Sequence, residues 1–362
     1  MSQIPLIDVK AQYGPLIPEL EARFREVVED GQFIRGPHFW AFQEEAAAFL
    51  GVSKTIGVAN GTDAIVILLD AMEIGPGDEV ICPAFTFYAT AESIARRGAT
   101  PVFADVDPAT MNVDVDDVAA KITKRTRALM PVHLFGRPAP MDDLLQLGRD
   151  VVEDAAQAFG APGIAKGGRI STFSFFPTKN LFCLGDGGLV AGDDEQLLER
   201  VRVLAFHGAR DKVDFDFVGY NSRLDELQAA FLRVLLTKID EWNAGRREAA
   251  ARYAELGLGE LVELPLDEPG HIYHLFVCRS PERDAIREAL REAKIGTATY
   301  YVTPLHLQPA LRFLGYEPGS LPETERVAGE NFSVPLWPGM PAEAQERVVD
   351  AVRSVVGVAA NA

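Results

Sequence analysis

Two neighbouring segments each join a strand-like run to a side chain that could do covalent chemistry. In DVVEDAAQAFGA at 150–161, an apolar run ends in two carboxylates, the second of them Asp154, before a turn of small residues. In ISTFSFFPTKN at 170–180, a second run is followed by Lys179 and then by the glycine-rich turn GDGG. Desolvation between a strand end and a glycine turn lowers the pKa of a lysine, and a neutral amine can condense with an aldehyde.

A third segment, ANGTDA at 59–64, has the composition of a phosphate-binding turn. It follows the run TIGVA, so its Gly and Thr would present N–H groups and a hydroxyl at the start of a helix. It is not a Walker loop, because no Gly-Lys-Ser/Thr follows. Taken alone, each of these pieces is more often a turn, a helix cap or a solvated side chain. Their order supplies the contacts that pyridoxal phosphate needs: Gly61, Thr62, an aromatic segment with Phe87, Asp154, Ser174 and Lys179.

The elements that must hold these residues follow from the alternation of short β-rich runs and helical segments between residues 55 and 190. This alternation is typical of a largely parallel sheet wrapped by helices, in which ligands bind at the carboxyl ends of the strands. The expected strands are 55–59, 79–83, 100–106, 128–133, 150–154, 170–176 and 187–191. The expected helices include 63–72 and 89–96. The predicted fold class is therefore α/β, with a mostly parallel central sheet.

The second half of the chain predicts a smaller C-terminal α+β domain. A segment rich in Leu, Ala, Glu and Arg predicts one long helix leading out of the large domain. The expected elements are this helix at 224–251, a strand at 270–279, a helix at 281–294 and a strand at 295–301. We expect a large domain over residues 1–240 and a small domain over 241–362, whose last eight residues carry no structural signal.

Composition narrows the class of protein. The chain has 362 residues, 48% of them hydrophobic, which is enough for a large core, and a formal net charge of -18, which argues against nucleic-acid or anionic-membrane partners. No long apolar stretch and no signal-peptide pattern occurs, so we expect a cytoplasmic protein. The three cysteines are far apart and should be buried thiols, and the histidines show no metal-binding spacing.

Motifs spread over nearly the whole chain, from PLIDVKAQY near the start to SVPLWPG at 333–339, make it resemble the DegT/DnrJ/EryC1/StrS family of sugar aminotransferases. Between these ends the motifs are IRGPHFWAFQEEAAAFLGV, VHLFGRPAPM, HGARDK, VGYNSRLDELQAA and PLHLQPAL, besides the three segments above. The resemblance implies the aspartate aminotransferase-like fold, type I of the pyridoxal-phosphate enzymes. This agrees with the α/β pattern read from the sequence.

The resemblance also implies a role for each site residue. Lys179 would form the internal aldimine and carry the proton, and Asp154 would keep the pyridine nitrogen protonated. Gln157 would contact the ring hydroxyl, and Phe87 would stack on the ring face. The phosphate would be bound by Gly61, Thr62 and Ser174 and, from the neighbouring subunit, by Asn221. The last contact implies a homodimer with shared active sites, although Asn221 could instead cap a helix beginning near Leu224.

The implied reaction moves an amino group from L-glutamate, through pyridoxamine phosphate, to a 3-keto or 4-keto sugar on UDP or dTDP. Arg210 and Lys212 could meet the diphosphate, or could lie in a solvated loop. Tyr300 begins Tyr-Tyr-Val where many relatives have His-Tyr-Pro, and Val213 also departs from the family pattern, so the particular sugar is left open. His306 could touch the sugar nucleotide or be a core or hinge histidine.

Two other functions compete with this one. A related branch of dehydratases uses pyridoxamine phosphate to remove a sugar hydroxyl, but its members replace the lysine with histidine, so Lys179 counts against it. A non-enzymatic regulator that binds pyridoxal phosphate would need a DNA-binding or sensory element. The sequence shows no such element, and its net charge has the wrong sign for DNA.

Overall fold

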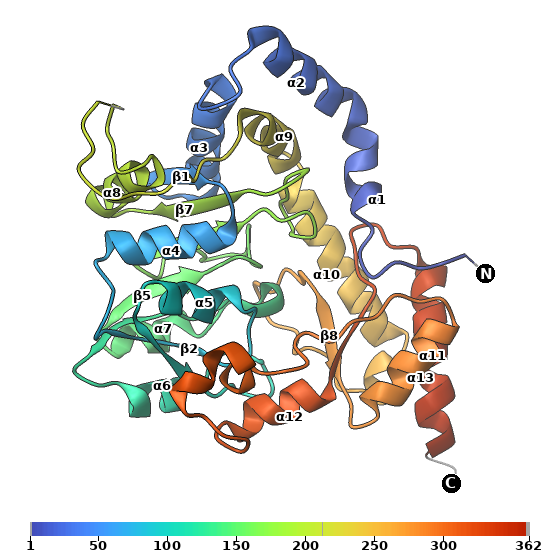
Figure 1. Ribbon diagram of the computed structural model, residues 1–362. Coiled ribbons are helices and arrows are strands. Elements are labelled where there is room, and N and C mark those ends of the chain that lie inside the picture. The colour runs from blue at the N-terminus through green and yellow to red at the C-terminus, as the bar shows by residue number, and fades with distance from the viewer. Residues whose placement is uncertain (1, 212, 360–362) are drawn as a thin grey trace.

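The computed structural model describes residues 2–211 and 213–359, and its centre is a seven-stranded sheet (Figure 1). The strands run in the order β1-β7-β6-β5-β4-β2-β3, and all neighbours are parallel except β7, which is antiparallel to both β1 and β6. Their bounds are β1 Lys54–Val58, β2 Glu79–Pro83, β3 Thr100–Ala104, β4 Thr126–Leu129, β5 Asp150–Asp154, β6 Ile170–Ser174 and β7 Gly188–Gly192. The predicted α/β class with a mostly parallel sheet is confirmed.

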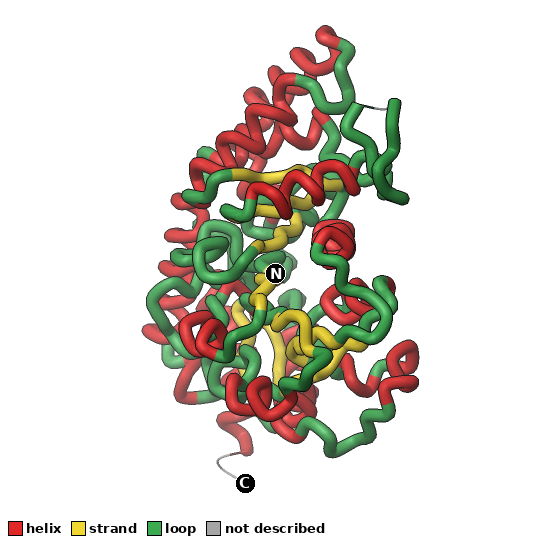
Figure 2. Tube along the Cα trace, turned by 90° about the vertical axis from the view of Figure 1, so that its left-hand side faces the viewer, coloured by secondary structure: helices red, strands yellow, loops and turns green. Residues whose placement is uncertain are grey.

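Helices cover both faces of this sheet, because its central strands are apolar on both sides. In β7, Val190 packs on one face with α4, α5 and α8, whereas Leu189 and Ala191 pack on the other face with α3 and α9. The helices before β8 are α1 Val9–Tyr13, α2 Ile17–Asp30, α3 Pro37–Leu50, α4 Gly61–Ala71, α5 Ala89–Arg96, α6 Val115–Lys121, α7 Met141–Gln146, α8 Glu195–Ala205, α9 Glu226–Leu236 and α10 Ile239–Glu255, with 3₁₀ turns at Gly14–Leu16, Leu134–Gly136 and Leu258–Glu260. Figure 2 shows the strands enclosed between the helices.

The C-terminal part adds a two-stranded antiparallel sheet with its own core. Residue Ile4 from the start of the chain packs into this core and pairs with Ile295. The elements are β8 Phe276–Arg279, α11 Arg283–Glu292, 3₁₀ turns at Leu305–Leu307 and Pro309–Leu314, α12 Pro322–Glu330, β9 Asn331–Val334 and α13 Ala342–Ala359. Within the described residues, no helix has both the length and the apolar character needed to cross a membrane.

Three expectations for the second half were wrong. The helix expected at 224–251 is two helices, α9 and α10, separated at Thr237, whose hydroxyl donates to the carbonyl of Val234 at 2.7 Å. The strand expected at 270–279 begins only at Phe276, because Tyr273 has a positive φ of 46° that a strand cannot contain. The expected strand at 295–301 makes only isolated bridges. The sequence gives no structural signal for the last eight residues, and α13 extends into them as far as Ala359.

Candidate active site

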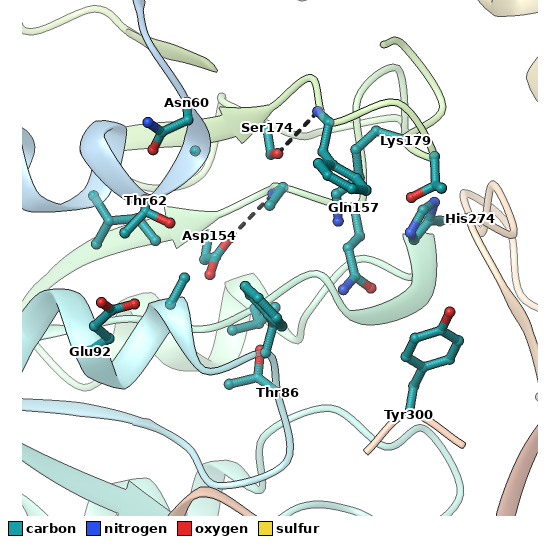
Figure 3. A pocket seen from close by; sticks show the side chains of 18 of the residues that line it. Asn60, Thr62, Thr86, Glu92, Asp154, Gln157, Ser174, Lys179, His274 and Tyr300 are labelled. Carbon is teal, nitrogen blue, oxygen red and sulfur yellow. Dashed lines mark hydrogen bonds between the residues drawn. The ribbon is translucent and has the colours of Figure 1, made fainter. Parts of the chain in front are cut away.

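A pocket of about 670 Å³ opens at the carboxyl ends of β5 and β6, beside the β1–α4 turn. Figure 3 shows Asn60 and Thr62 on one side of it and His274 and Tyr300 on the other, with Asp154, Gln157 and Lys179 between them. Of the residues expected from the sequence, the pocket brings together Gly61, Thr62, Phe87, Asp154, Gln157, Ser174, Lys179 and Tyr300.

The β1–α4 turn forms a cradle with room for a ligand but not for larger side chains. Asn60 caps α4, its Oδ1 accepting from the Asp63 N–H at 2.8 Å. A Cβ atom placed on Gly61 would lie 2.7 Å from the Ser174 Cβ, and one on Gly188 would lie 2.4 Å from the Asn60 backbone. The start of α4 and the Ser174 side chain therefore lie against each other, as an anion site at a helix N-terminus requires.

Asp154 is a buried carboxylate at the end of β5. The Thr90 hydroxyl donates to its Oδ2 at 2.8 Å, and the Ala156 N–H donates to its Oδ1 at 3.2 Å. Burial raises the pKa of Asp154, although both hydrogen bonds and the nearby Lys179 act in the opposite direction. A cation brought beside this carboxylate would therefore be strongly favoured.

Lys179 reaches solvent only partly, through the pocket that it lines. Burial lowers its pKa to about 8, against the opposing charge of Asp154. The turn that follows is packed closely, since a Cβ on Gly187 would lie 2.5 Å from the Cys183 sulfur. A lysine with this pKa has an appreciable neutral fraction near pH 7 and can act as a nucleophile.

Aromatic, amide and imidazole side chains line the rest of the pocket. The Oε1 of Gln157 accepts from the Phe135 N–H at 2.7 Å, and its Nε2 donates to the Tyr301 hydroxyl at 3.1 Å. Phe87 is 58% exposed, so a ring face remains free for a planar ligand. The buried His274 bonds through Nδ1 to Asn180 Oδ1 at 3.2 Å, and burial holds its pKa well below the ordinary value.

Asn221 and Arg210 do not line this pocket. Asn221 is exposed, and it is not the cap of the following helix, because α9 begins at Glu226 after Asp225. Arg210 is exposed and pairs with Asp216 at 3.2 Å. The other loop cation expected here, Lys212, lies outside the described residues.

His306 also lies away from the pocket, in the environment of a core histidine. Its side chain is fully buried, and its Nε2 lies 3.1 Å from Glu325 Oε1 on α12. Burial lowers the pKa of His306, with Glu325 opposing the shift. Tyr300, by contrast, lines the pocket, and burial raises the pKa of its hydroxyl.

Three residues of the site were not anticipated in their observed roles: Thr90, His274 and Tyr301. Thr90 lies 64 positions before Asp154, and Tyr301 lies 144 positions after Gln157, so no local pattern connects them. His274 lies in a segment that was expected to be a strand. The sequence gives no signal for these three roles. It does give one for a fourth residue, Asn60, which stands directly before Gly61 in the expected phosphate turn and is a preferred N-cap residue.

The donor set fits pyridoxal phosphate. The start of α4 and Ser174 line the pocket, where N–H groups and a hydroxyl can meet an anion; the buried Asp154 can face a ring cation, and the Lys179 amine can bind an aldehyde. A fold and a site of this kind define a pyridoxal-phosphate enzyme of fold type I. Within that class, the chain belongs to the DegT/DnrJ/EryC1/StrS aminotransferase family, whose model matches residues 16–353.

Relatives in this family cover the chain almost end to end. It is 44% identical to a protein of Geobacillus stearothermophilus named pleiotropic regulatory protein, over 96% of this chain and 97% of that protein. It is 41% identical to the UDP-N-acetyl-3-dehydro-alpha-D-glucosamine 3-aminotransferase of Acidithiobacillus ferrooxidans, over 97% of each. The solved structure of S. venezuelae DesV in complex with a ketimine intermediate has a TM-score of 0.95 and 41% identity, with 98% of each chain covered.

Proposed function

We propose that this protein transfers an amino group from L-glutamate to a keto sugar carried on UDP or dTDP. The observation that carries the proposal is the Lys179 amine, with a pKa of about 8, in one pocket with Asp154 and the α4 cradle. The Acidithiobacillus relative is named for a UDP-linked 3-dehydro sugar, and relatives from Streptomyces venezuelae and Aneurinibacillus thermoaerophilus are named as transaminases of dTDP-linked 3-amino sugars. These names favour a 3-keto substrate over a 4-keto one.

Each residue of the pocket then has a defined task. Bound pyridoxal phosphate supplies an electron sink for breaking the bond between the donor carbon and its proton. Lys179 Nζ would hold the cofactor at its aldehyde, and its free amine would carry the proton within the site. Asp154 would hold a proton at the ring nitrogen, and the N–H groups of the cradle with Ser174 would bind the phosphate. Phe87 and Tyr300 enclose the space and limit access of water.

We further propose a homodimer in which each pocket is completed by the partner. Asn221 and Arg210 lie outside the pocket of their own chain, so their expected contacts with cofactor phosphate and sugar diphosphate require a neighbouring subunit. Large exposed apolar side chains on and after α2 offer a surface for that subunit. They are Phe24, Val28, Phe33, Ile34 and Trp40.

The pleiotropic regulator named among the relatives favours one other candidate, a protein that binds the cofactor without catalysis. The two differ in what glutamate does. An aminotransferase loaded with pyridoxal phosphate should lose its near-ultraviolet to violet absorption band when glutamate is added, and 2-oxoglutarate should restore the band. A band that persists at saturating glutamate would favour the regulator.

The lysine itself gives the decisive variant. Lys179→Ala should abolish turnover while circular dichroism and binding of pyridoxamine phosphate persist, because the residue is a covalent catalyst. Lys166→Ala removes an exposed lysine from the same part of the chain and should keep the wild-type rate. A panel of UDP-linked and dTDP-linked amino sugars, assayed in reverse with 2-oxoglutarate, identifies the substrate. Ordinary transamination by Lys179→Ala would exclude the proposed mechanism.

A further inference from the structure

The orientation of the Gln157 amide is fixed by the backbone. The Phe135 N–H can only donate, so the amide atom that it meets at 2.7 Å must be the oxygen, Oε1. The other end, 3.1 Å from the Tyr301 hydroxyl oxygen, is therefore the NH₂ group. Gln157 must donate there, and the Tyr301 oxygen must accept.

This leaves the proton of the Tyr301 hydroxyl without an acceptor. An amide NH₂ cannot accept it, and no other hydrogen bond reaches this hydroxyl from the residues that the structure describes. Burial, and more weakly the charge of Asp154, raises the pKa of Tyr301, so the hydroxyl keeps its proton at neutral pH. Tyr301 is partly buried and lines the pocket, so an atom that enters the pocket, from water or from a bound ligand, can accept this proton.

The Tyr301 ring is held firmly enough to aim this proton. It makes edge contacts with Phe85 and Tyr300, both with ring centroids 5.9 Å apart, and a tilted contact with Phe87 at 6.3 Å. Tyr301, Gln157 and Lys179 all line the same pocket. Two donors are therefore left over in the pocket that Lys179 lines: the Tyr301 O–H and the second N–H of Gln157.

We propose that Tyr301 donates a hydrogen bond to the ring oxygen of the pyridoxal cofactor, next to Gln157. This inference rests on the proposed function, in which Gln157 contacts the same atom. An ionised ring oxygen accepts two hydrogen bonds well, and bonds to a charged acceptor are the stronger ones. Tyr301 is then a direct contact of the cofactor.

The test uses Tyr301→Phe, which keeps the ring and its contacts with Phe85 and Phe87. Without any substrate, its affinity for pyridoxamine phosphate should fall about tenfold by calorimetry, as expected for one lost hydrogen bond to a charged group. The pH midpoint of the absorption band with pyridoxal phosphate should rise. The less stabilised ring oxygen keeps more negative charge, which holds the proton on the neighbouring lysine nitrogen more tightly. Tyr13→Phe, which makes the same chemical change at a residue that does not line this pocket, is the matched control and should leave both values unchanged.

A cofactor analogue distinguishes the two possible acceptors of the Tyr301 proton, the ring oxygen of the cofactor and an oxygen of the sugar substrate. With 3-O-methyl pyridoxamine phosphate, wild type and Tyr301→Phe should bind equally, because the ionised ring oxygen is absent. If Tyr301→Phe keeps wild-type cofactor affinity and spectrum and loses only sugar affinity, the proton serves the substrate and the proposal is overturned. Should this variant fail to fold, Gln157→Leu provides the comparison: without the amide, a remaining preference for pyridoxamine phosphate over its 3-O-methyl analogue would come from Tyr301, and loss of all preference would overturn the proposal. Failure of the proposed function would appear differently, as a wild-type spectrum identical to that of Lys179→Ala.

Discussion

At the residue scale, the pocket moves the pKa values of its acid and its base toward each other. Burial lowers the pKa of Lys179 to about 8 and raises that of Asp154, so in the ligand-free chain both charged forms are disfavoured. A protonated ring nitrogen beside Asp154 would restore a partner to the carboxylate. The buried Asp154 charge is therefore favourable only when the cofactor is bound. Removing the charge should lower the activity of the enzyme but not the stability of the cofactor-free protein.

Asp154→Asn tests this opposition. The rate of the amino-transfer half-reaction, followed by absorbance after mixing with glutamate, should fall roughly 10²- to 10³-fold, the usual effect of removing one electrostatic contact from a preorganised site. The stability of the cofactor-free protein should change the other way. A carboxyl group with a raised pKa in the fold binds protons more tightly there than in the unfolded chain, so it lowers stability as pH rises through its ordinary range.

The cofactor-free Asp154→Asn protein should therefore unfold at the same or a higher temperature than wild type at pH 7. The difference should shrink as pH falls below the ordinary pKa of the carboxyl group, 3.8, where the wild-type group is protonated in both states. A wild-type rate with full cofactor occupancy would remove the role of Asp154, and a lower melting temperature at pH 7 would contradict the account of its burial.

The sequence predicted the reactive groups of the site better than the residues that hold these groups in position. Asp154 and Lys179 each follow an apolar strand run, so the sequence order alone placed them at one sheet edge. Thr90 and Tyr301, which orient Asp154 and Gln157, come from distant segments and are ordinary residue types. Tertiary packing decides which distant hydroxyl contacts which buried group, and the periodicity of a sequence does not predict tertiary packing.

At the element scale, α3 and α9 are joined by a buried carboxylate that the motif VGYNSRLDELQAA supplies. Glu226 is 1% exposed, and its two oxygens accept from the N–H groups of His38 at 2.6 Å and Phe39 at 3.0 Å. The residue before α3 is Gly36, which has no side chain to cap the helix. Glu226 from α9 therefore caps the N-terminus of α3, where a negative charge is also favoured by the helix dipole.

Glu226→Gln should lower the free energy of unfolding by about 1–2 kcal/mol, because one acceptor becomes an NH₂ group facing an N–H group and the charge is lost. Urea denaturation of the cofactor-free protein measures the change. Glu44→Gln makes the same chemical change at an exposed site of α3 and should stay within about 0.5 kcal/mol of wild type. Equal stability of the two variants would show that the cap contributes nothing.

The elements that carry the site were predictable because their strands are short, apolar and separated by clear turn signals. The bounds of β2, β5 and α5 agree with the sequence pattern to the residue. The break between α9 and α10 was not predictable, since Thr237 and Lys238 are neither Gly nor Pro and the apolar pattern continues across them. The loop that carries His274 resembles a strand in its sequence because it contains β-forming residues, but Ile272 and Tyr273 pack into two different hydrophobic cores instead of a sheet.

At the scale of the whole molecule, two residues of family motifs, Asn221 and Arg210, do not line the pocket of their own chain. Asn221 and Arg210 are exposed, and α2, at the top of Figure 1, has apolar side chains facing solvent. A dimer would explain all three features together. The division into domains near residue 240 stays a prediction, although α10 begins at this point.

Linkage gives the first test of the dimer. If Asn221 of one subunit binds the cofactor phosphate of the other, pyridoxal phosphate binds the dimer more tightly than the monomer. Dilution of the cofactor-free protein should then favour monomer, and added pyridoxal phosphate should shift sedimentation toward dimer and raise the melting temperature. Asn221→Ala should weaken this shift. A cofactor effect on melting without any effect on assembly would place the whole site within one chain.

Mixing two inactive variants gives the second test. Lys179→Ala lacks the catalytic amine, and Asn221→Ala lacks the proposed contact to its partner's cofactor phosphate, so each homodimer has two defective sites. In a hybrid dimer, the site on the Asn221→Ala chain combines an intact Lys179 with the partner's intact Asn221, whereas the other site lacks both. Activity should therefore recover toward one working site per hybrid after subunit exchange, which fluorescence energy transfer between labelled chains can verify. A mixture of Lys179→Ala with an Asn221→Ala, Lys179→Ala double variant should stay inactive. Verified exchange without recovery would show that Asn221 does not complete the neighbouring site.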